Sequence, residues 1–193
     1  MTAFSTRCCR GFDLPSALVA LWLAVIAALP AHATGIEVRK ANVAITEDAY
    51  VLEGQFDIAL TNTLEEVLSK GVPLYFLLEF ELIRPRWYWF NERVVQLQQQ
   101  YRLSYNALTR QYRLAVGNLH QNFASLAEAL EVMSRVRRRE EVEPGTLRRD
   151  TTHIAALRLR LDTSQLPKPF QLSALGSREW YIGSDWVRWT VNP

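Results

Sequence analysis

The sequence predicts a mainly β protein, an antiparallel β-sandwich of about seven strands with two short helices. Three observations predict this fold. Apolar residues recur at every second position over much of the chain, short turns separate consecutive segments of this kind, and only two short stretches change to helical spacing. The 193 residues are 49% hydrophobic and 22% charged, with a single long apolar run. This composition excludes a disordered chain and a multi-span membrane protein.

The N-terminal 33 residues are typical of a signal peptide. Arg7 and Arg10 form a positive n-region, residues 18–29 form an apolar h-region, and a small-x-small pattern ends at Ala33. We expect cleavage between Ala33 and Thr34, which places the mature protein in the periplasm.

The alternative to cleavage is an uncleaved signal anchor that holds the protein in the inner membrane, since the apolar run 14–29 approaches the length of a membrane span. With cleavage, residues 34–193 form a single β-sandwich-like domain. Cys8 and Cys9 leave with the signal peptide, so we expect a mature chain without disulfides.

The first half of the mature chain predicts a hairpin, a short helix and a buried strand. Residues 36–45 and 50–60 form the hairpin, because the second of them alternates apolar and polar side chains. Asn62 is an N-cap residue type followed three positions later by glutamate, and Gly71 is placed to end the helix. Residues 72–83 are nearly all apolar, as in a central strand buried on both faces.

The second half predicts further strands around one helix. Residues 87–105 form a long segment in whose later part apolar and polar side chains alternate, and residues 112–116 are the next strand. After Asn118 the spacing becomes helical, with Ser125 as the N-cap. The prolines at 167 and 169 interrupt the chain, and two closing regions, 154–161 and 180–191, return to strand.

Arginines concentrate in residues 135–149, where glutamates separate them. We interpret this segment as the end of a helix followed by a solvated loop whose charges pair with one another. Contact with anionic lipid or with an acidic patch of a partner is the alternative.

The residue inventory favours a protein without catalytic activity. The mature chain keeps two histidines, His120 and His153, and neither has an acidic neighbour at metal-ligand spacing. The sequence contains no zinc-protease, esterase or β-lactamase motif, and its glycines are too isolated to build a phosphate-binding loop. We therefore expect no cofactor, no metal and no catalytic residue.

Glu79 and Glu81 lie two residues apart on an otherwise apolar strand, so both face the same side. Two carboxylates about 7 Å apart can act as acid and base in glycoside chemistry. The other interpretation is an exposed strand face on which these glutamates pair with arginines such as Arg84 or Arg102.

Two aromatic clusters are the most distinctive feature of the sequence. Trp87, Tyr88, Trp89 and Phe90 are consecutive, and the residues Trp186 and Trp189 repeat the theme near the C-terminus. Alternation along a strand would bury one pair of the first cluster and expose the other, which makes these residues the candidate partner-binding surface. The alternative is a sandwich core filled with tryptophan.

Four segments carry a resemblance to a known family. They are GVPL at 71–74, RPRWYW at 84–89, YRLSYN at 101–106 and TRQY at 109–112. Together with the export signal, they make the mature chain similar to small exported proteobacterial proteins that are catalogued as a domain of unknown function and sometimes labelled proline-rich signal peptide proteins. The resemblance implies a Gram-negative periplasmic setting. It also implies an envelope signalling partner, because family members often lie beside a membrane sensor kinase.

These observations favour a periplasmic, non-enzymatic binding or accessory protein whose partner is a protein of the cell envelope. The alternative is a carbohydrate-binding or glycoside-hydrolysing domain that uses exposed aromatic side chains and the Glu79/Glu81 pair. Net charge of +2 and export exclude nucleic acid as a partner. Membrane contact is expected only through an uncleaved signal segment.

We predict that protein recovered from the periplasm begins at Thr34, because the small residues at Ala31 and Ala33 set the cleavage site. N-terminal sequencing of that material checks the prediction. Retention of residues 1–33 on protein found in the inner membrane would establish the signal anchor instead.

Overall fold

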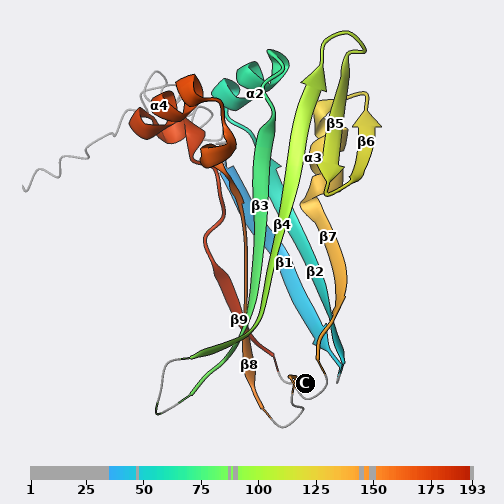
Figure 1. Cartoon of the computed structure of the whole chain (residues 1–193), viewed down its shortest axis with the longest axis vertical. Helices are drawn as coiled ribbons and strands as arrows, with labels where there is room; N and C mark the ends of the chain where they lie inside the picture. The colour runs from blue at the N-terminus through green and yellow to red at the C-terminus, as the bar shows by residue number, and fades with distance from the viewer. Residues whose placement is uncertain are drawn as a thin grey trace, which may run out of the picture. The chain divides into compact units, whose positions relative to one another are not determined.

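A computed structural model describes residues 35–46, 48–86, 88, 91–143, 146–147 and 151–191. They belong to one compact unit, Thr34–Pro193. The predicted cleavage site at Ala33 and Thr34 lies outside the described residues. The predicted mainly β fold is confirmed, since the unit contains two antiparallel sheets and its strands pack as a sandwich (Figure 1). The described residues form nine strands and three α-helices, more than the predicted seven and two.

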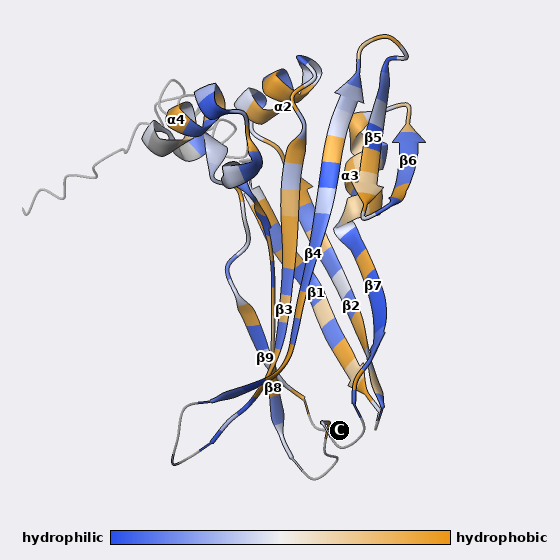
Figure 2. Ribbon diagram, in the orientation of Figure 1, coloured by the Kyte–Doolittle hydropathy of each residue, from blue (hydrophilic) through white to orange (hydrophobic). Residues whose placement is uncertain are grey.

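The smaller sheet has the strand order β1-β2-β7, with β1 (Gly35–Ile45), β2 (Ala49–Ala59) and β7 (Arg135–Glu141). The hairpin of β1 and β2 is the predicted one. The prediction of a helix end and solvated loop over 135–149 is wrong, because Arg135–Glu141 pairs with β2 as a strand. Only Val136 of this strand is buried. Charged residues at the other positions hide the alternation that would otherwise indicate a strand (Figure 2).

The larger sheet has the strand order β6-β5-β4-β3-β8-β9. Its strands are β3 (Leu74–Arg84), β4 (Glu92–Asn106), β5 (Gln111–Val116), β6 (Leu119–Phe123), β8 (His153–Leu161) and β9 (Val187–Val191). All of its neighbouring strands run antiparallel. The helical spacing expected directly after Asn118 is wrong for β6, whose residues are exposed except at Phe123 and so carry no apolar period.

The helices cap the ends of the sheets. α2 (Asn62–Ser69) begins one residue earlier than predicted, because the hydroxyl of Thr61 accepts a hydrogen bond from the Leu64 amide. α3 (Leu126–Ser134) has the predicted N-cap, Ser125. α4 (Lys168–Gly176) was expected as an interruption, but proline is favoured in the first turn of a helix. Two 3₁₀ turns, Thr163–Gln165 and Arg178–Trp180, flank α4.

The centre of the core is the inward face of β3. Its residues there are almost completely buried: Leu74, Phe76, Leu78, Phe80 and Leu82.

Close approach of the two sheets depends on Gly54 of β2. A Cβ atom at this position would lie 3.2 Å from Cδ2 of Leu157 on β8, closer than side chains normally pack. Nearby, the rings of Tyr50 and Phe80 join β2 to β3, with centroids 5.4 Å apart. The glycine therefore lets β2 lie directly on the larger sheet.

His153, the first residue of β8, is a fully buried ionisable residue. Burial and the positive charge of Arg84 both lower the pKa of His153. The folded protein therefore keeps this imidazole neutral under conditions in which an exposed histidine would bind a proton.

We predict that the free energy of unfolding falls as the pH is lowered below about 6.5, the ordinary pKa of histidine. The unfolded chain binds a proton at residue 153 more readily than the folded chain, so protonation favours unfolding. The loss approaches about 1.4 kcal/mol per pH unit until the lowered pKa of the folded state is reached. Denaturant titrations of wild type and His153→Gln check this: the variant should lose that part of the pH dependence, and equal slopes would contradict it.

Candidate functional site

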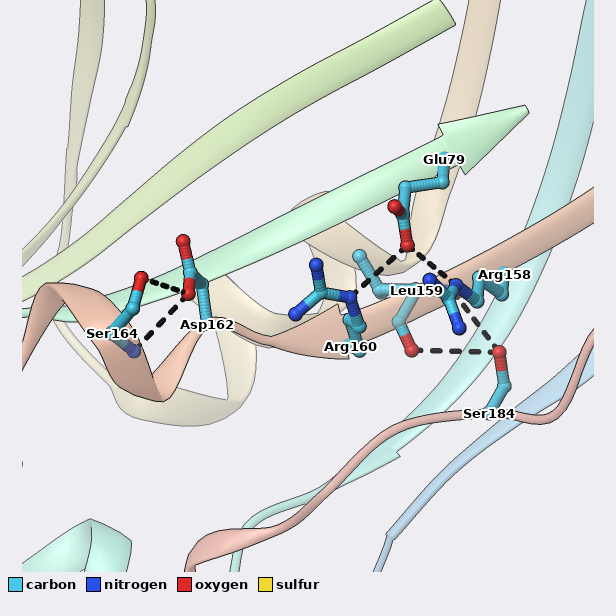
Figure 3. A network of polar contacts seen from close by, with 7 residues as sticks. All are labelled: Glu79, Arg158, Leu159, Arg160, Asp162, Ser164 and Ser184. Carbon is cyan, nitrogen blue, oxygen red and sulfur yellow. Dashed lines mark hydrogen bonds and ion pairs between the residues drawn. The ribbon is translucent and has the colours of Figure 1, made fainter. Parts of the chain in front are cut away.

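The outer face of the larger sheet carries a buried carboxylate held by two arginines. Glu79 of β3 is 8% exposed. Its Oε2 accepts hydrogen bonds from Nε of Arg158 at 2.5 Å and from Nε of Arg160 at 3.1 Å (Figure 3). Burial alone would raise the pKa of Glu79, but the two arginines outweigh it and hold the pKa below its usual value. The Glu79 carboxylate is therefore ionised at neutral pH and already bound by two arginines.

This network fastens the segment before β9 to the sheet. The Ser184 hydroxyl accepts a hydrogen bond from the Leu159 amide at 3.0 Å. The Arg158 guanidinium lies 4.4 Å from the ring centroid of Trp186, in a cation–π contact. Gly183 passes so close to β8 that a Cβ there would lie 2.8 Å from the Arg160 Cβ. The role supported by this geometry is structural.

Glu81 forms an ion pair with Arg93, with 3.6 Å between the Oε2 and Nε atoms. The expected pairing of the two glutamates with arginines is therefore found, but the expected exposed face is wrong, since both side chains are largely buried, and the named partners are wrong as well. Arg84 pairs with Glu92, at 3.2 Å. The guanidinium of Arg102 lies over the Tyr75 ring, 5.9 Å from its centroid. Register sets the actual partners, since Arg158 lies directly opposite Glu79 on β8.

The predicted aromatic residues fall into three groups. Trp87, Trp89 and Phe90 lie outside the described residues, while Tyr88 between them is 66% exposed. Trp186 is half-buried on the arginine network. Trp189 of β9 is also half-buried and packs against the hydrophobic core. Of the aromatic residues in the described part of the chain, Tyr88 thus best fits the predicted exposed surface.

The first half of β4 has a free edge. β4 pairs with β3 over residues 92–103 but with β5 only over 101–106. In the part of the chain that the structure describes, no strand pairs with the other side of residues 92–100, and β5 and β6 accompany only the far part of β4 (Figure 1). An extra residue, Val94, makes a β-bulge near the start. Residues 95–100 then continue as regular strand.

The remaining sheet edges carry features that prevent pairing between molecules. β7 has charged side chains at six of its seven positions. β1 has an irregularity at Arg39 and Lys40, and β6 and β9 are only five residues long. Residues 95–100 of β4, by contrast, read VQLQQQ and contain no charge and no proline. Beyond the bulge at Val94, none of these features protects this edge within the described part of the chain.

Arg138 lies on the inward face of β7, together with the buried Val136. Its Nη2 lies 3.2 Å from Oε1 of Glu140. Burial raises the pKa of Tyr50 to about 12; the negative charge of Glu140 adds to this effect and the positive charge of Arg138 opposes it. Burial also raises the pKa of Tyr101, and Arg138 opposes this increase as well. Register gives the same neighbourhood: Tyr50 and Leu52 of β2 pair with Glu140 and Arg138 of β7. The Tyr50 ring contacts Phe80 of β3, which pairs with Leu97 of β4, so the inward face of β7 lies over β4 near Leu97.

Sequence reasoning did not find this edge, although a signal was present. β4 is 15 residues long and β5 only six, so a hairpin between them must leave part of the longer strand uncovered unless another strand pairs there. The uncharged run at 94–100 is a second signal. The pairing register was needed to show that the two coincide.

Two open hollows lie on the smaller sheet. One, of about 240 Å³, is lined by Lys40, Asn42 and Glu53 among others. The second, of about 390 Å³, lies between β2 and α3, and both are bordered by Gln55 and Arg135. Their charged side chains largely pair locally, as in the contact of Arg135 with Glu131. Neither hollow brings together groups for catalysis.

The fold and these surfaces define the chain as a mainly β, two-sheet sandwich domain. The family model described as domain of unknown function (DUF4390) matches residues 33–190, and the chain belongs to this family. No curated protein and no solved structure matches the chain.

Within the described residues, no helix combines the length and the apolar character needed to span a membrane.

We predict that Glu79→Gln destabilises the protein by about 1–3 kcal/mol at neutral pH, because the charged partners of a largely buried group lose their counter-charge. Below the ordinary glutamate pKa the difference from wild type should shrink, because the folded state lowers this pKa and its stabilising effect disappears as the carboxylate gains a proton. Thermal melts at neutral and acidic pH check both effects. Glu37→Gln, at an exposed position of β1, is the matched control. Equal melts for the two variants would contradict the prediction.

Proposed function

We propose that this protein is an exported, non-enzymatic accessory protein of the cell envelope that binds a partner protein. The observation that carries the proposal is the unprotected edge of β4 at residues 95–100. An exposed sheet edge binds an extended segment of another protein through main-chain hydrogen bonds, a common mode of peptide recognition. The periplasm is the proposed compartment, and an envelope signalling protein is the proposed class of partner.

Exposed apolar groups at both ends of the edge support binding at this place. Tyr88, in the predicted aromatic cluster, lies four residues before Glu92, the first residue of β4. At the other end, Leu119 is 79% exposed and pairs with Val116, which in turn pairs with Tyr101 of β4. A bound strand would therefore meet apolar side chains beyond each end of its main-chain contacts, and exposed aromatic residues are common hot spots in interfaces.

The carbohydrate alternative has no comparable support. Its proposed acid–base pair requires a carboxyl group that keeps its proton near neutral pH. Glu79 is ionised and bound by two arginines, and the side chain of Glu81 is only 15% exposed and faces Arg93. Glu79 is therefore not free to protonate a leaving sugar, and Glu81 already pairs with an arginine.

The proposal is tested by photo-crosslinking in the native host. A photoreactive amino acid at Gln96 or Gln98 of the free edge should form an adduct with the same partner protein. At Gln121, which is also an exposed glutamine but lies on the edge strand β6, it should form none.

Gln98→Lys should reduce adduct formation from position 96 at least fivefold, because edge lysines oppose strand pairing. Adducts of equal yield from position 121, or none from the β4 positions, would overturn the proposal.

A further inference from the structure

We infer that the segment bound at the β4 edge presents an acidic side chain to Arg138. This inference rests on the proposed function and specifies the chemistry of the partner. The occupant is an extended segment whose inward-facing positions are apolar except for one aspartate or glutamate.

The shape of the site favours a segment of another protein over a second copy of this chain. Two-fold antiparallel pairing of β4 with its copy about Leu97 would place residue 101 of the copy opposite residue 93, where β5 of the copy already occupies the pairing edge. The β3–β4 hairpin would then compete with β5 for the same space. A single added strand needs only the open edge at 95–100.

The alternation of the partner follows from the faces of the sheet. On the outer side, the added strand would lie beside the exposed amides of Gln96, Gln98 and Gln100. On the inner side it would lie beside the buried Val95, beside Leu97, which packs against the core, and beside the half-buried Gln99. Because directly paired residues of neighbouring strands share a face, the segment must be polar on one face and mainly apolar on the other, with room for a polar residue beside Gln99.

The acidic residue follows from Arg138. Its Nε atom is buried and meets no hydrogen-bond acceptor in the described part of the chain. An unsatisfied buried donor is costly, and a guanidinium can bind a carboxylate with two parallel hydrogen bonds. The side chain remains 37% exposed, so an incoming group can reach it.

Glu140 is the only anion recorded within ion-pair distance of Arg138 among the described residues, and it does not satisfy the guanidinium. The contact is to one terminal nitrogen, at 3.2 Å, and the Glu140 side chain is 40% exposed. Pairs of such exposure contribute little to stability. An acidic residue of a partner strand, held in place by main-chain hydrogen bonds, can therefore replace Glu140 at this position.

The test uses a phage library of random dodecapeptides selected on the purified full chain. Enriched peptides should carry aspartate or glutamate with apolar residues two positions before and after it. A synthetic peptide of the selected sequence should bind Arg138→Gln at least tenfold more weakly than wild type. Its affinity for Arg138→Lys should lie between these two values. Replacing the acidic residue of the peptide by its amide should weaken binding to wild type by the same factor. The same replacement should not weaken binding to Arg138→Gln any further.

Arg137→Gln is the matched control, because this arginine lies on the same strand but on the opposite, exposed face and pairs with Glu53. Its affinity for the peptide should change less than twofold. Thermal melts of all variants establish that each is folded.

The outcomes separate this inference from the proposed function. Peptides weakened by Gln98→Lys but not by Arg138→Gln would overturn the acidic contact and leave strand addition at β4 intact. Peptides insensitive to both changes, or a library without enrichment, would overturn both.

Discussion

The packing of β2 against β3 and β8 is the contact on which the rest of the structure depends. Gly54 allows β2 to approach Leu157 of β8, Tyr50 contacts Phe80 of β3, and the buried inward face of β3 fills the space between the sheets. β3 lies between β4 and β8, and its register with them determines which of their side chains meet on each face of the sheet. The position of Glu79 opposite Arg158 on one side, and the position of the β4 edge on the other, both follow from it.

Strands with one apolar face could be predicted from the sequence, whereas charged strands could not. The hairpin of β1 and β2 and the alternation of 154–161 gave clear signals, because burial of one face forces a period of two. β7 has one buried residue, Val136, and its pairing with β2 supplies the backbone hydrogen bonds that make it a strand. The formation of β7 thus depends on tertiary context, and its own sequence shows no clear strand pattern.

The candidate site was less predictable than the fold, for a related physical reason. Residue types identified Glu79 as unusual and Tyr88 as a candidate surface residue, but only register shows which charges meet and which edge stays open. Arg138 illustrates this difficulty. In the sequence it is one arginine among several between residues 135 and 149, and its distinction is that it points between the sheets while Arg137 and Arg139 point outward.

The brevity of β5 gives the sheet an adjustable interface. Each pair of residues added to the β5–β6 hairpin at its Gly117 turn, one in each strand, would cover about one further residue of β4. An insertion of roughly six residues in each strand would close the edge completely while leaving the core untouched. The length of this hairpin alone thus determines whether the β4 edge is open to a partner strand or covered by the protein's own β5. A family with this fold can therefore gain or lose a partner through a surface insertion.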